Sequence, residues 1–295
     1  MISAQGTGVE RKKWRKIMEA LKKETRIKLD ILEKWFLERK GSIIAFSGGI
    51  DSSLVLYLAR KWQGRERAIG VISKSESLKT KDFELALSFS ELFDIHMEVI
   101  ETRELDDERY SSNPIDRCFF CKDHLYNDLQ VIRDRFPGFE VLNGTNTDDY
   151  TDYRPGMKAA DKYDVYSPLA LCRITKEEIR EISRHFGLPN WDKPASPCLS
   201  SRIPYAHPIT KKKLVEVERA EDLLNTFGFK DVRVRHYGDH GRVEVPAEDV
   251  PRLMEMRDRV IMEIKEVGFR DVVIDEEGLV SGKMNRVIKS VKSVK

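Results

Sequence analysis

The sequence predicts an α/β protein in which helices cover both faces of a parallel sheet, followed by a smaller α+β domain at the C-terminal end. Strand-like apolar runs alternate with helical segments between residues 42 and 186, and this order is typical of parallel sheets. After residue 187, glycine and proline interrupt the pattern and a different order of elements follows. We therefore expect one domain over residues 1–190 and a second over residues 191–295.

Residues 9–40 place apolar side chains at helical spacing, which predicts an amphipathic helix or a pair of helices ahead of the sheet. The strands that follow are expected at 42–46, 68–73, 96–100 and 139–143. The helices between and after them are expected at 51–62, 80–93, 118–135 and 175–186. Because parallel sheets bind ligands beyond the carboxyl ends of their strands, we expect the segments after residues 46, 73 and 143 to meet in one crevice.

The second domain is introduced by a proline-rich linker near residues 187–208. Its helices are expected at 210–227 and 247–267, and its strands at 231–236, 241–245 and 270–275. Both helices lead into a Gly-Phe pair and then a strand, at Gly228-Phe229 and at Gly268-Phe269. This repetition predicts a small two-fold repeat of helix, Gly-Phe turn and strand.

The turn after the first strand, residues 47–53 with the sequence SGGIDSS, carries the strongest chemical signal. Its two glycines allow a tight turn and a close approach of the backbone to a ligand. The following helix directs its first amides and the positive end of its dipole at this turn, so the turn predicts a phosphate site. The turn lacks the Gly-Lys-Ser/Thr ending of a Walker A loop and the third glycine of the dinucleotide-binding fingerprint.

This strand, turn and helix resemble the PP-loop of the ATP pyrophosphatase superfamily, which includes GMP synthetase, NAD synthetase, asparagine synthetase and the tRNA thiolases. The resemblance implies that ATP is cleaved between its α and β phosphates and that AMP activates a carboxylate or carbonyl oxygen. Together with the converging strand ends, it implies an ATP site formed by Ala45, Ser47, Gly48, Gly49, Asp51, Ser52, Ser73 and Gly144.

The composition narrows the class of protein. Of the 295 residues, 40% are hydrophobic and 35% are charged, as in ordinary globular proteins, and no apolar run is long enough to cross a membrane. The N-terminus lacks the apolar core of a secretory signal, and the four cysteines fit a reducing compartment, so we expect a cytoplasmic protein. Basic residues gather at both ends and leave an acidic centre, which argues against nucleic acid as a partner.

Three of the cysteines are candidates for chemistry. Cys118 and Cys121 form a Cys-x-x-Cys at the start of a helix. Such a pair can bind zinc or an iron–sulfur cluster, form a redox disulfide, or simply be buried in the core. Cys198 lies in a proline-rich loop beside hydroxyl side chains and Arg202, where positive charge favours a thiolate. Cys172 follows an apolar run and is expected in the core.

Two polar segments are candidate anion or metal sites. Arg233 and Arg235 alternate with apolar residues on a strand, so they face the same side and suit a phosphate or carboxylate, unless they only form an exposed polar face. The loop 144–156 follows a strand end. Its carboxylates are candidate Mg²⁺ ligands and its Arg154 is a candidate anion contact, although a solvated turn has the same composition.

Several segments spread over residues 28–285 resemble a family of sulfur transferases. This is the LarE family, which completes the nickel-pincer cofactor of lactate racemase. The matching segments are AFSGGIDS at 45–52, NPIDRCFFCK at 113–122, NGTN at 143–146, DYRPG at 152–156, WDKPA at 191–195, CLSSRIPY at 198–205 and VRVRH at 232–236. The resemblance implies that ATP adenylylates a carboxylate of a pyridinium biscarboxylic acid mononucleotide. A sulfur nucleophile then displaces AMP and leaves a thiocarboxylate. The resemblance also implies a homo-oligomer.

The resemblance to this family also implies roles for individual residues. One branch of the family spends a sacrificial cysteine, matched by Cys198, which becomes dehydroalanine. Another branch holds a 4Fe–4S cluster on three cysteines, and the presence of Cys118, Cys121 and Cys198 favours that branch. Cys198, Asp51 and Lys122 take catalytic roles, with Lys122 neutralising the α-phosphate. The implied substrate contacts are Arg154, Ser201, Arg202, Arg233, Arg235 and Glu244, and the implied divalent-metal contact is Glu221 or Glu218.

The expected cofactors are therefore ATP, Mg²⁺ and a 4Fe–4S cluster, and the expected partner is a small nucleotide-like molecule. The alternative is a tRNA thiolase of the same superfamily, which also combines a PP-loop with three cysteines. A non-catalytic sensor of ATP or AMP is a third possibility, which the intact turn and Cys198 disfavour. The chain departs from the family at Ala206, where glycine is common after Pro-Tyr, and this leaves the conformation of the local turn open.

Overall fold

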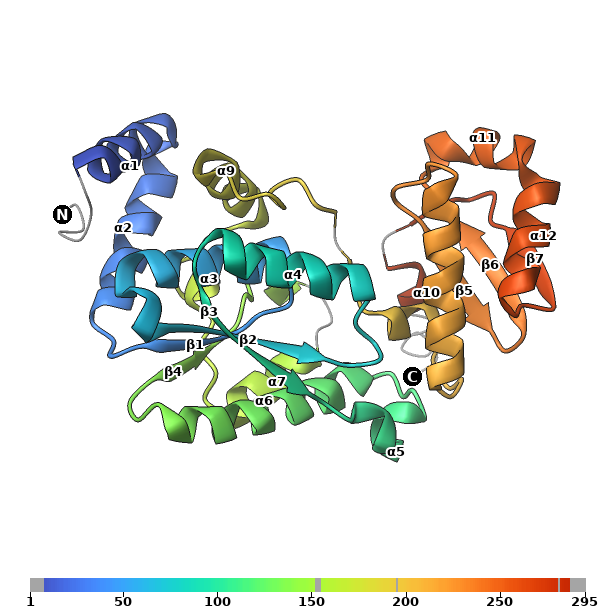
Figure 1. The fold of residues 1–295 in the computed structure, drawn as a ribbon, viewed down its shortest axis with the longest axis horizontal. Helices are drawn as coiled ribbons and strands as arrows, with labels where there is room; N and C mark the ends of the chain where they lie inside the picture. The colour runs from blue at the N-terminus through green and yellow to red at the C-terminus, as the bar shows by residue number, and fades with distance from the viewer. Residues whose placement is uncertain (1–7, 152–154, 195, 281, 287–295) are drawn as a thin grey trace. The chain divides into compact units, whose positions relative to one another are not determined.

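The structure is a computed structural model and describes residues 8–151, 155–194, 196–280 and 282–286 (Figure 1). The chain folds into two compact units. The first unit comprises residues 1–75, 80–102 and 119–196, and the second comprises residues 76–79, 103–118 and 197–295. Two short segments from the first half of the chain therefore belong to the second unit.

A four-stranded parallel sheet forms the centre of the first unit (Figure 1). Its spatial order is β3-β2-β1-β4, and its strands are β1 (Ser42–Ala45), β2 (Ala68–Lys74), β3 (His96–Glu101) and β4 (Glu140–Leu142). β1 pairs in parallel with both β2 and β4, so the carboxyl ends of these three strands lie at the same edge. The parallel α/β sheet predicted from the sequence is confirmed, and each strand end lies within one residue of its expected position.

Helices cover both faces of this sheet, as the sequence predicts. α3 (Ile50–Gln63) and α4 (Thr80–Leu92) lie on one face, and α6 (Arg117–Arg135) and α7 (Gly156–Lys162) lie on the other (Figure 1). The apolar side chains of α6 and α7 pack against alternate residues of β1 and β2, because successive strand residues point to opposite faces. The main members of this buried cluster are Ile43, Ala45, Ile69, Val71, Tyr126, Leu129, Ile132 and Ala159.

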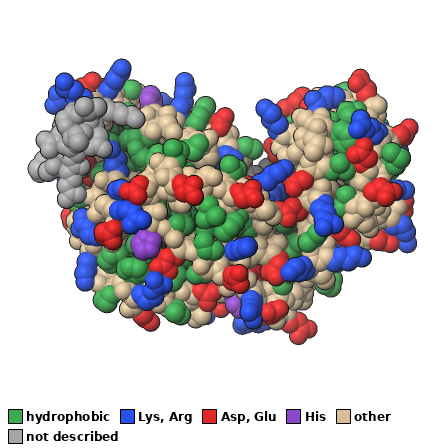
Figure 2. Space-filling view, in the orientation of Figure 1, with side chains coloured by type: hydrophobic (Ala, Val, Ile, Leu, Met, Phe, Trp, Pro, Cys, Tyr) green, Lys and Arg blue, Asp and Glu red, His purple; other side chains and the backbone are tan. Residues whose placement is uncertain are grey.

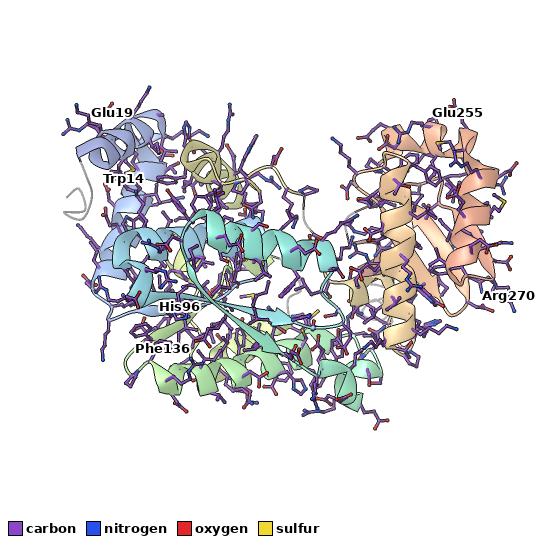
Figure 3. The ribbon with its side chains drawn as sticks, in the orientation of Figure 1. Trp14, Glu19, His96, Phe136, Glu255 and Arg270 are labelled. Carbon is purple, nitrogen blue, oxygen red and sulfur yellow. The ribbon has the colours of Figure 1, made fainter. Side chains whose placement is uncertain are left out.

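The amphipathic N-terminal segment forms a pair of helices, α1 (Gly8–Ala20) and α2 (Lys23–Leu37). Trp14 of α1, labelled in Figure 3, stacks on Phe186 with ring centroids 5.1 Å apart and meets Trp62 edge-on at 6.1 Å. Phe186 is the last residue of α9 (Lys176–Phe186), so these rings fasten α1 to α3 and α9. The unit's shorter elements are η1 (Arg65–Arg67), η3 (Thr147–Thr151) and α8 (Pro168–Leu171).

A three-stranded sheet in the order β5-β6-β7 organises the second unit. β5 (Arg233–Tyr237) pairs antiparallel with β6 (His240–Glu244), which pairs in parallel with β7 (Asp271–Ile274). The helices of this unit are α5 (Glu108–Ser111), α10 (Lys211–Thr226), α11 (Val250–Glu255) and α12 (Arg257–Val267). Short turns of 3₁₀-helix complete it, at η2 (Glu104–Asp106), η4 (Leu199–Arg202), η5 (Ala247–Asp249) and η6 (Lys283–Asn285). The smaller α+β domain is thus confirmed.

One helix expected from the sequence is wrong in its extent. The segment 247–267 was expected as a single helix, but Met256 (φ −100°, ψ 7°) ends α11 and precedes α12. Leu253 and Val260 on the two sides of this break are both fully buried in the core of the unit. The apolar residues keep their helical spacing across the break, so the hydrophobic periodicity alone does not predict it.

The predicted Gly-Phe repeat is present. Gly228 (φ +86°) and Gly268 (φ +136°) follow α10 and α12 in conformations that favour glycine. Phe229 and Phe269, which follow them, are both buried in the apolar cluster under the sheet. Among the described residues, none of the helices combines the length and the apolar character needed to cross a membrane.

Candidate active site

Hydroxyl groups close the turn between β1 and α3. The amide of Ser47 donates to Oγ of Ser52 at 3.2 Å, and the two hydroxyl oxygens lie 3.0 Å apart. Ser52 Oγ also donates to the carbonyl of Gly49 at 3.1 Å. Gly48 adopts φ +69°, a conformation that glycine takes without strain. The turn is thus shaped by its own side chains, and it precedes the first amides of α3, which in any helix lie beyond the reach of the intrahelical i→i−4 pattern.

The end of β4 approaches this turn closely. A Cβ atom added to Gly144 would lie 2.6 Å from the amide nitrogen of Ser52 and 2.9 Å from its Cα. These are backbone atoms and cannot move aside as a flexible side chain would. Gly144 is therefore required by the packing of the loop after β4 against the first turn of α3, which brings two of the expected strand ends together.

The carboxylate of Asp51 is held by a lysine from a distant part of the chain. Lys176 Nζ lies 2.6 and 2.8 Å from the two carboxylate oxygens of Asp51. Asn146 Nδ2 donates to the same carboxylate at 3.3 Å. Both side chains of the ion pair are partly exposed, at 34% for Lys176 and 25% for Asp51, so a solvent-borne ligand can reach them.

Lys176 and Asn190 are the site residues that sequence reasoning missed. Lys176 is the first residue of α9, whose N-cap is Thr175 in a capping box with Glu178. The helix dipole disfavours a cation at a helix N-terminus. The lysine at this unfavourable position was therefore the signal in the sequence that Lys176 has a functional role. Asn190 donates to the carbonyl of Gly48 at 3.1 Å and to Ser53 Oγ at 2.8 Å, but it lies in a segment interpreted only as a linker.

The acidic residues of the loop 144–156 contribute to the structure of that loop. Asp149 accepts from the amide of Asn146 at 3.1 Å, and Asp148 accepts from the amide of Lys176 at 2.7 Å. These bonds order the loop beside Asp51. Arg154, expected as an anion contact, lies outside the described residues.

Three other residues expected at the nucleotide site lie on two strands and one helix of the first unit. Ala45 ends β1, and Ser73 lies near the end of β2 with its hydroxyl 2.6 Å from that of Thr102. Lys122 lies on α6 with its ammonium 6.0 Å from the ring centroid of Tyr126. The hydroxyl of Tyr126 accepts from Asn143 at 3.3 Å, at the end of β4. Lys122 is therefore two contacts away from the strand end that reaches the turn.

In the second unit, hydrogen bonds fix the turn that carries Cys198. The amide of Leu199 donates to the carbonyl of Ser77 at 2.8 Å, and the hydroxyl of Ser200 lies 2.6 Å from that of Tyr110. Arg235 Nη1 donates to the carbonyl of Ser201 at 3.0 Å. Cys198 is partly exposed as a residue, and these hydrogen bonds fix the backbone on its C-terminal side.

Arg202 ties this turn together from inside. It is fully buried, and its Nε and Nη2 donate to the two oxygens of Glu221 at 2.8 and 3.0 Å. Its Nη1 donates to the carbonyls of Pro197 and Cys198 at 2.5 and 3.2 Å and to Ser201 Oγ at 3.0 Å. Each guanidinium nitrogen of Arg202 is therefore engaged by the protein itself.

Glu221 is the buried counter-ion of this group. Burial by itself raises the pKa of the Glu221 carboxyl, but Arg202 and Lys79 together hold that pKa below its ordinary value. Lys79 Nζ lies 2.5 Å from Oε2, and the amide of Val234 donates to Oε1 at 3.0 Å. The metal role expected for Glu221 stays a prediction, because its oxygens here contact cations and a backbone amide. Glu218 is partly buried on the same helix.

Arg233 and Arg235 are buried on one face of β5. Arg235 donates from Nε and Nη2 to Oε2 of Glu244 at 2.9 and 2.7 Å. Arg233 Nη1 donates to the carbonyl of Val232 at 2.9 Å, and burial together with the charge of Arg202 lowers the Arg233 pKa. Arg233 Nη1 also contacts Asp231 Oδ1 at 3.2 Å. Two guanidiniums on one strand face form a candidate anion site. On the face shown in Figure 2, basic and acidic side chains are interspersed over the surface.

Ala206 adopts φ +65°, a left-handed conformation that favours glycine. Its amide donates to the carbonyl of Asn113 at 3.0 Å. The side chain of Asn113, itself fully buried, donates to the carbonyls of Pro204 and His207 at 2.7 and 3.0 Å. The turn that the sequence left open is thus the one glycine would make, and alanine holds it at the expense of strain.

The cysteines differ in exposure. Cys118 is exposed, Cys121 and Cys198 are partly buried, and Cys172 is buried as expected, where burial raises its pKa to about 11. Cys118 and Cys198 belong to the second unit and Cys121 to the first. Within the described part of the chain, no group of three or more His, Cys, Asp or Glu side chains is arranged to hold a metal ion. The structure therefore gives no support to the 4Fe–4S cluster.

The parallel sheet and the SGGIDSS turn between β1 and α3 define the PP-loop class of ATP-using enzymes, and the NAD synthase family model matches residues 17–114. The chain is 40% identical, over 88% of its length, to an uncharacterised protein of Synechocystis, of which it covers 98%. It is 35% identical, over 82% of its length, to the pyridinium-3,5-bisthiocarboxylic acid mononucleotide synthase of Lactiplantibacillus plantarum, of which it covers 88%.

An uncharacterised protein of Methanocaldococcus jannaschii is 26% identical over 88% of the chain. The likeness to the synthase extends over most of both proteins. The chain therefore belongs to the pyridinium-3,5-bisthiocarboxylic acid mononucleotide synthase family, the LarE family of ATP-dependent, AMP- and pyrophosphate-forming enzymes.

Proposed function

We propose that the protein inserts sulfur into a pyridinium biscarboxylic acid mononucleotide at the expense of ATP. A carboxylate oxygen of the acceptor attacks the α-phosphorus of ATP, and the bond from that phosphorus to the bridging oxygen breaks and releases pyrophosphate. A sulfur nucleophile then attacks the acyl carbon, the bond to AMP breaks, and a thiocarboxylate forms. The observation that carries this proposal is the family likeness over most of the chain, together with the turn held by Asp51 and Lys176.

The first unit supplies the activation step. The amides at the start of α3 and the positive end of its dipole stabilise the charge that develops on the leaving pyrophosphate. Lys176 contributes a second positive charge beside Asp51. In this proposal Asp51 receives the Mg²⁺ that arrives with ATP, which frees the ammonium of Lys176 for a phosphate oxygen. Lys122 neutralises the α-phosphate.

The second unit binds the phosphate of the acceptor. Arg233 and Arg235 share a strand face, and Glu244 fixes the plane of the Arg235 guanidinium. A planar fork with remaining N–H groups suits a phosphate dianion. Ser201 lies beside this fork, because its carbonyl accepts from Arg235. We therefore assign the acceptor's phosphate to Arg233, Arg235 and the hydroxyl of Ser201.

The acceptor site is tested by Arg235→Ala, with Arg242→Ala as the matched control. Arg242 lies opposite Arg235 on β6 and its side chain is 44% exposed. Arg235→Ala should raise the KM of the acceptor at least tenfold and leave the KM of ATP unchanged, because a charge-assisted bond to phosphate contributes about 1.5–3 kcal/mol. An equal rise in both KM values, or the same result for Arg242→Ala, refutes the assignment.

The source of the sulfur is the finer part of the proposal. From the sequence we retain a 4Fe–4S cluster on Cys118, Cys121 and Cys198 as the first proposal, although the described residues form no such group. The second is Cys198 as donor. In that case its Cα proton is lost, its Cβ–S bond breaks, and dehydroalanine remains as the thiocarboxylate leaves. The exposure and the fixed turn of Cys198 suit an attacking sulfur in this second case.

Intact-protein mass spectrometry after reaction separates the two sources. A cluster protein, reconstituted without oxygen, turns over repeatedly when sulfide is supplied and keeps its mass, and each of its three cysteines is needed while Cys172 is not. A donor protein works once and loses the mass of H₂S from the peptide that contains Cys198. A homo-oligomer and a cytoplasmic location remain predictions.

A further inference from the structure

A short segment, Glu76–Lys79, contacts the turn that carries Cys198. The chain enters this segment immediately after β2, and it belongs to the second unit. The carbonyl of Ser77 accepts from the amide of Leu199 at 2.8 Å. Two residues later, Lys79 Nζ lies 2.5 Å from Glu221 Oε2. Leu199 is the neighbour of Cys198, so the segment holds the backbone next to the sulfur.

Glu221 joins this segment to the inside of the turn. Its carboxylate accepts a bidentate pair of hydrogen bonds from Arg202. Arg202 is fully buried and also donates hydrogen bonds to the carbonyls of Pro197 and Cys198. One guanidinium is enough to balance one buried carboxylate. Lys79 is therefore a second cation on the same anion, and its side chain keeps 21% of its surface exposed. Its contact therefore ties the segment to Glu221 in addition to helping Arg202 balance the charge of that carboxylate.

We propose that Lys79 is a positioning residue for the sulfur-transfer step. By anchoring Glu76–Lys79 on Glu221, it keeps the Ser77 carbonyl at the Leu199 amide and so fixes the orientation of Cys198. Glu221 then serves as the shared anchor of Lys79 and Arg202, and Arg202 acts through the backbone of the turn instead of touching the acceptor. A displacement of about 1 Å at a reacting atom is enough to lower a rate by about 10²-fold. This inference rests on the proposed function.

The test compares Lys79→Met, which removes the charge and keeps the aliphatic stem, with Lys79→Arg, which keeps the charge. Lys230→Met is the control, because Lys230 is an exposed lysine of the same unit. The acceptor is pyridinium biscarboxylic acid mononucleotide. Pyrophosphate release in the first turnover reports the activation step, and thiocarboxylate formation reports sulfur transfer. Hydrogen exchange at the Leu199 amide, followed by mass spectrometry, reports the contact itself.

Lys79→Met should lower the rate of sulfur transfer about tenfold or more while first-turnover pyrophosphate release stays within about twofold of the unsubstituted protein. The Leu199 amide should exchange faster, and Lys79→Arg should restore both values. The inference is overturned if Lys79→Met transfers sulfur as fast as Lys230→Met. It is also overturned if pyrophosphate release falls as much as sulfur transfer, which indicates a general folding defect.

A second variant separates positioning from metal binding at Glu221. Glu221→Gln keeps the shape of the side chain but loses both ion pairs, so it should slow sulfur transfer at every Mg²⁺ concentration. Rescue of Glu221→Gln by added Mg²⁺ or Mn²⁺ would overturn the positioning role. If the unsubstituted protein itself forms no thiocarboxylate, the proposed function fails, and the exchange of the Leu199 amide in Lys79→Met still decides the positioning contact.

Discussion

Lys176 Nζ lies 2.6 Å from one carboxylate oxygen of Asp51 and 2.8 Å from the other, although 125 residues separate them along the chain. The pair lies at the start of α3, beside the turn that the sequence marks as a phosphate site. The contact connects the PP-loop to α9, so a lysine at the start of α9 becomes a candidate for the proposed nucleotide site.

The first prediction concerns Asp51. Asp51→Asn keeps the size of the side chain but removes the charge that we assign to Mg²⁺, and it leaves one oxygen where two now accept from Lys176. Pyrophosphate release should fall to the background rate, and the circular dichroism spectrum and melting temperature should stay near those of the unsubstituted protein. Undiminished release in a folded Asp51→Asn protein would remove this carboxylate from the mechanism.

The second prediction concerns Lys176. Lys176→Met should lower pyrophosphate release about 10²-fold, the typical effect of losing one charge-stabilising donor, and Lys176→Arg should recover part of that loss. Lys162→Met is a suitable control, because Lys162 forms a 2.6 Å ion pair with Asp123 elsewhere in the same unit. Equal rates for the two methionine variants would show that the Lys176 contact is only structural.

The third prediction concerns the strained turn at Ala206 (φ +65°). Ala206→Gly removes the clash of Cβ with the backbone and should raise the free energy of unfolding by about 1 kcal/mol, partly offset by the greater freedom of glycine in the unfolded chain. Urea unfolding measures the difference. A lower free energy of unfolding in Ala206→Gly would contradict the strain that we infer.

The fourth prediction concerns the buried His236. Burial lowers the pKa of His236, against the opposing effect of its 2.8 Å contact with Glu216. His236 therefore takes up a proton near pH 6.5 in the unfolded chain, but only at lower pH in the folded chain. The free energy of unfolding should fall as pH drops below about 6.5, by at most about 1.4 kcal/mol per pH unit.

His236→Gln keeps a donor toward Glu216 but cannot titrate. Urea unfolding at a series of pH values from about 7.5 down to 5.5 should give a shallower decline for this variant than for the unsubstituted protein. Parallel curves for the two proteins would mean that His236 does not carry the pH dependence.

The sheet and the phosphate turn were predictable because their signals are local. Alternating apolar runs locate each strand, and SGGIDSS identifies the turn without knowledge of the rest of the chain. The turns at Gly228 and Gly268 are also predictable locally, because each glycine is followed by a phenylalanine whose apolar ring favours burial. These features require only neighbours in the sequence to be recognised.

The partners of the site side chains were not predictable, because contacts between distant segments leave no periodic signal. The spacing of Arg233 and Arg235 indicates a shared face, but not that Glu244 holds one of them. Likewise, the position of Arg202 near Cys198 in the sequence suggests a substrate contact. Its burial and its hydrogen bonds to Glu221 and to carbonyls of the turn are visible only in the structure. The place of residues 76–79 and 103–118 in the second unit follows from such long-range contacts as well.

Mass spectrometry of pyridinium biscarboxylic acid mononucleotide, after incubation with the protein and ATP, decides whether the protein inserts sulfur. The proposed reaction requires that an acceptor carboxylate exchanges an oxygen for a sulfur, with one AMP and one pyrophosphate formed for each exchange, and that Asp51→Asn abolishes all three products. An acceptor of unchanged mass beside ATP cleaved to AMP and pyrophosphate, or ATP left intact under these conditions, would contradict it.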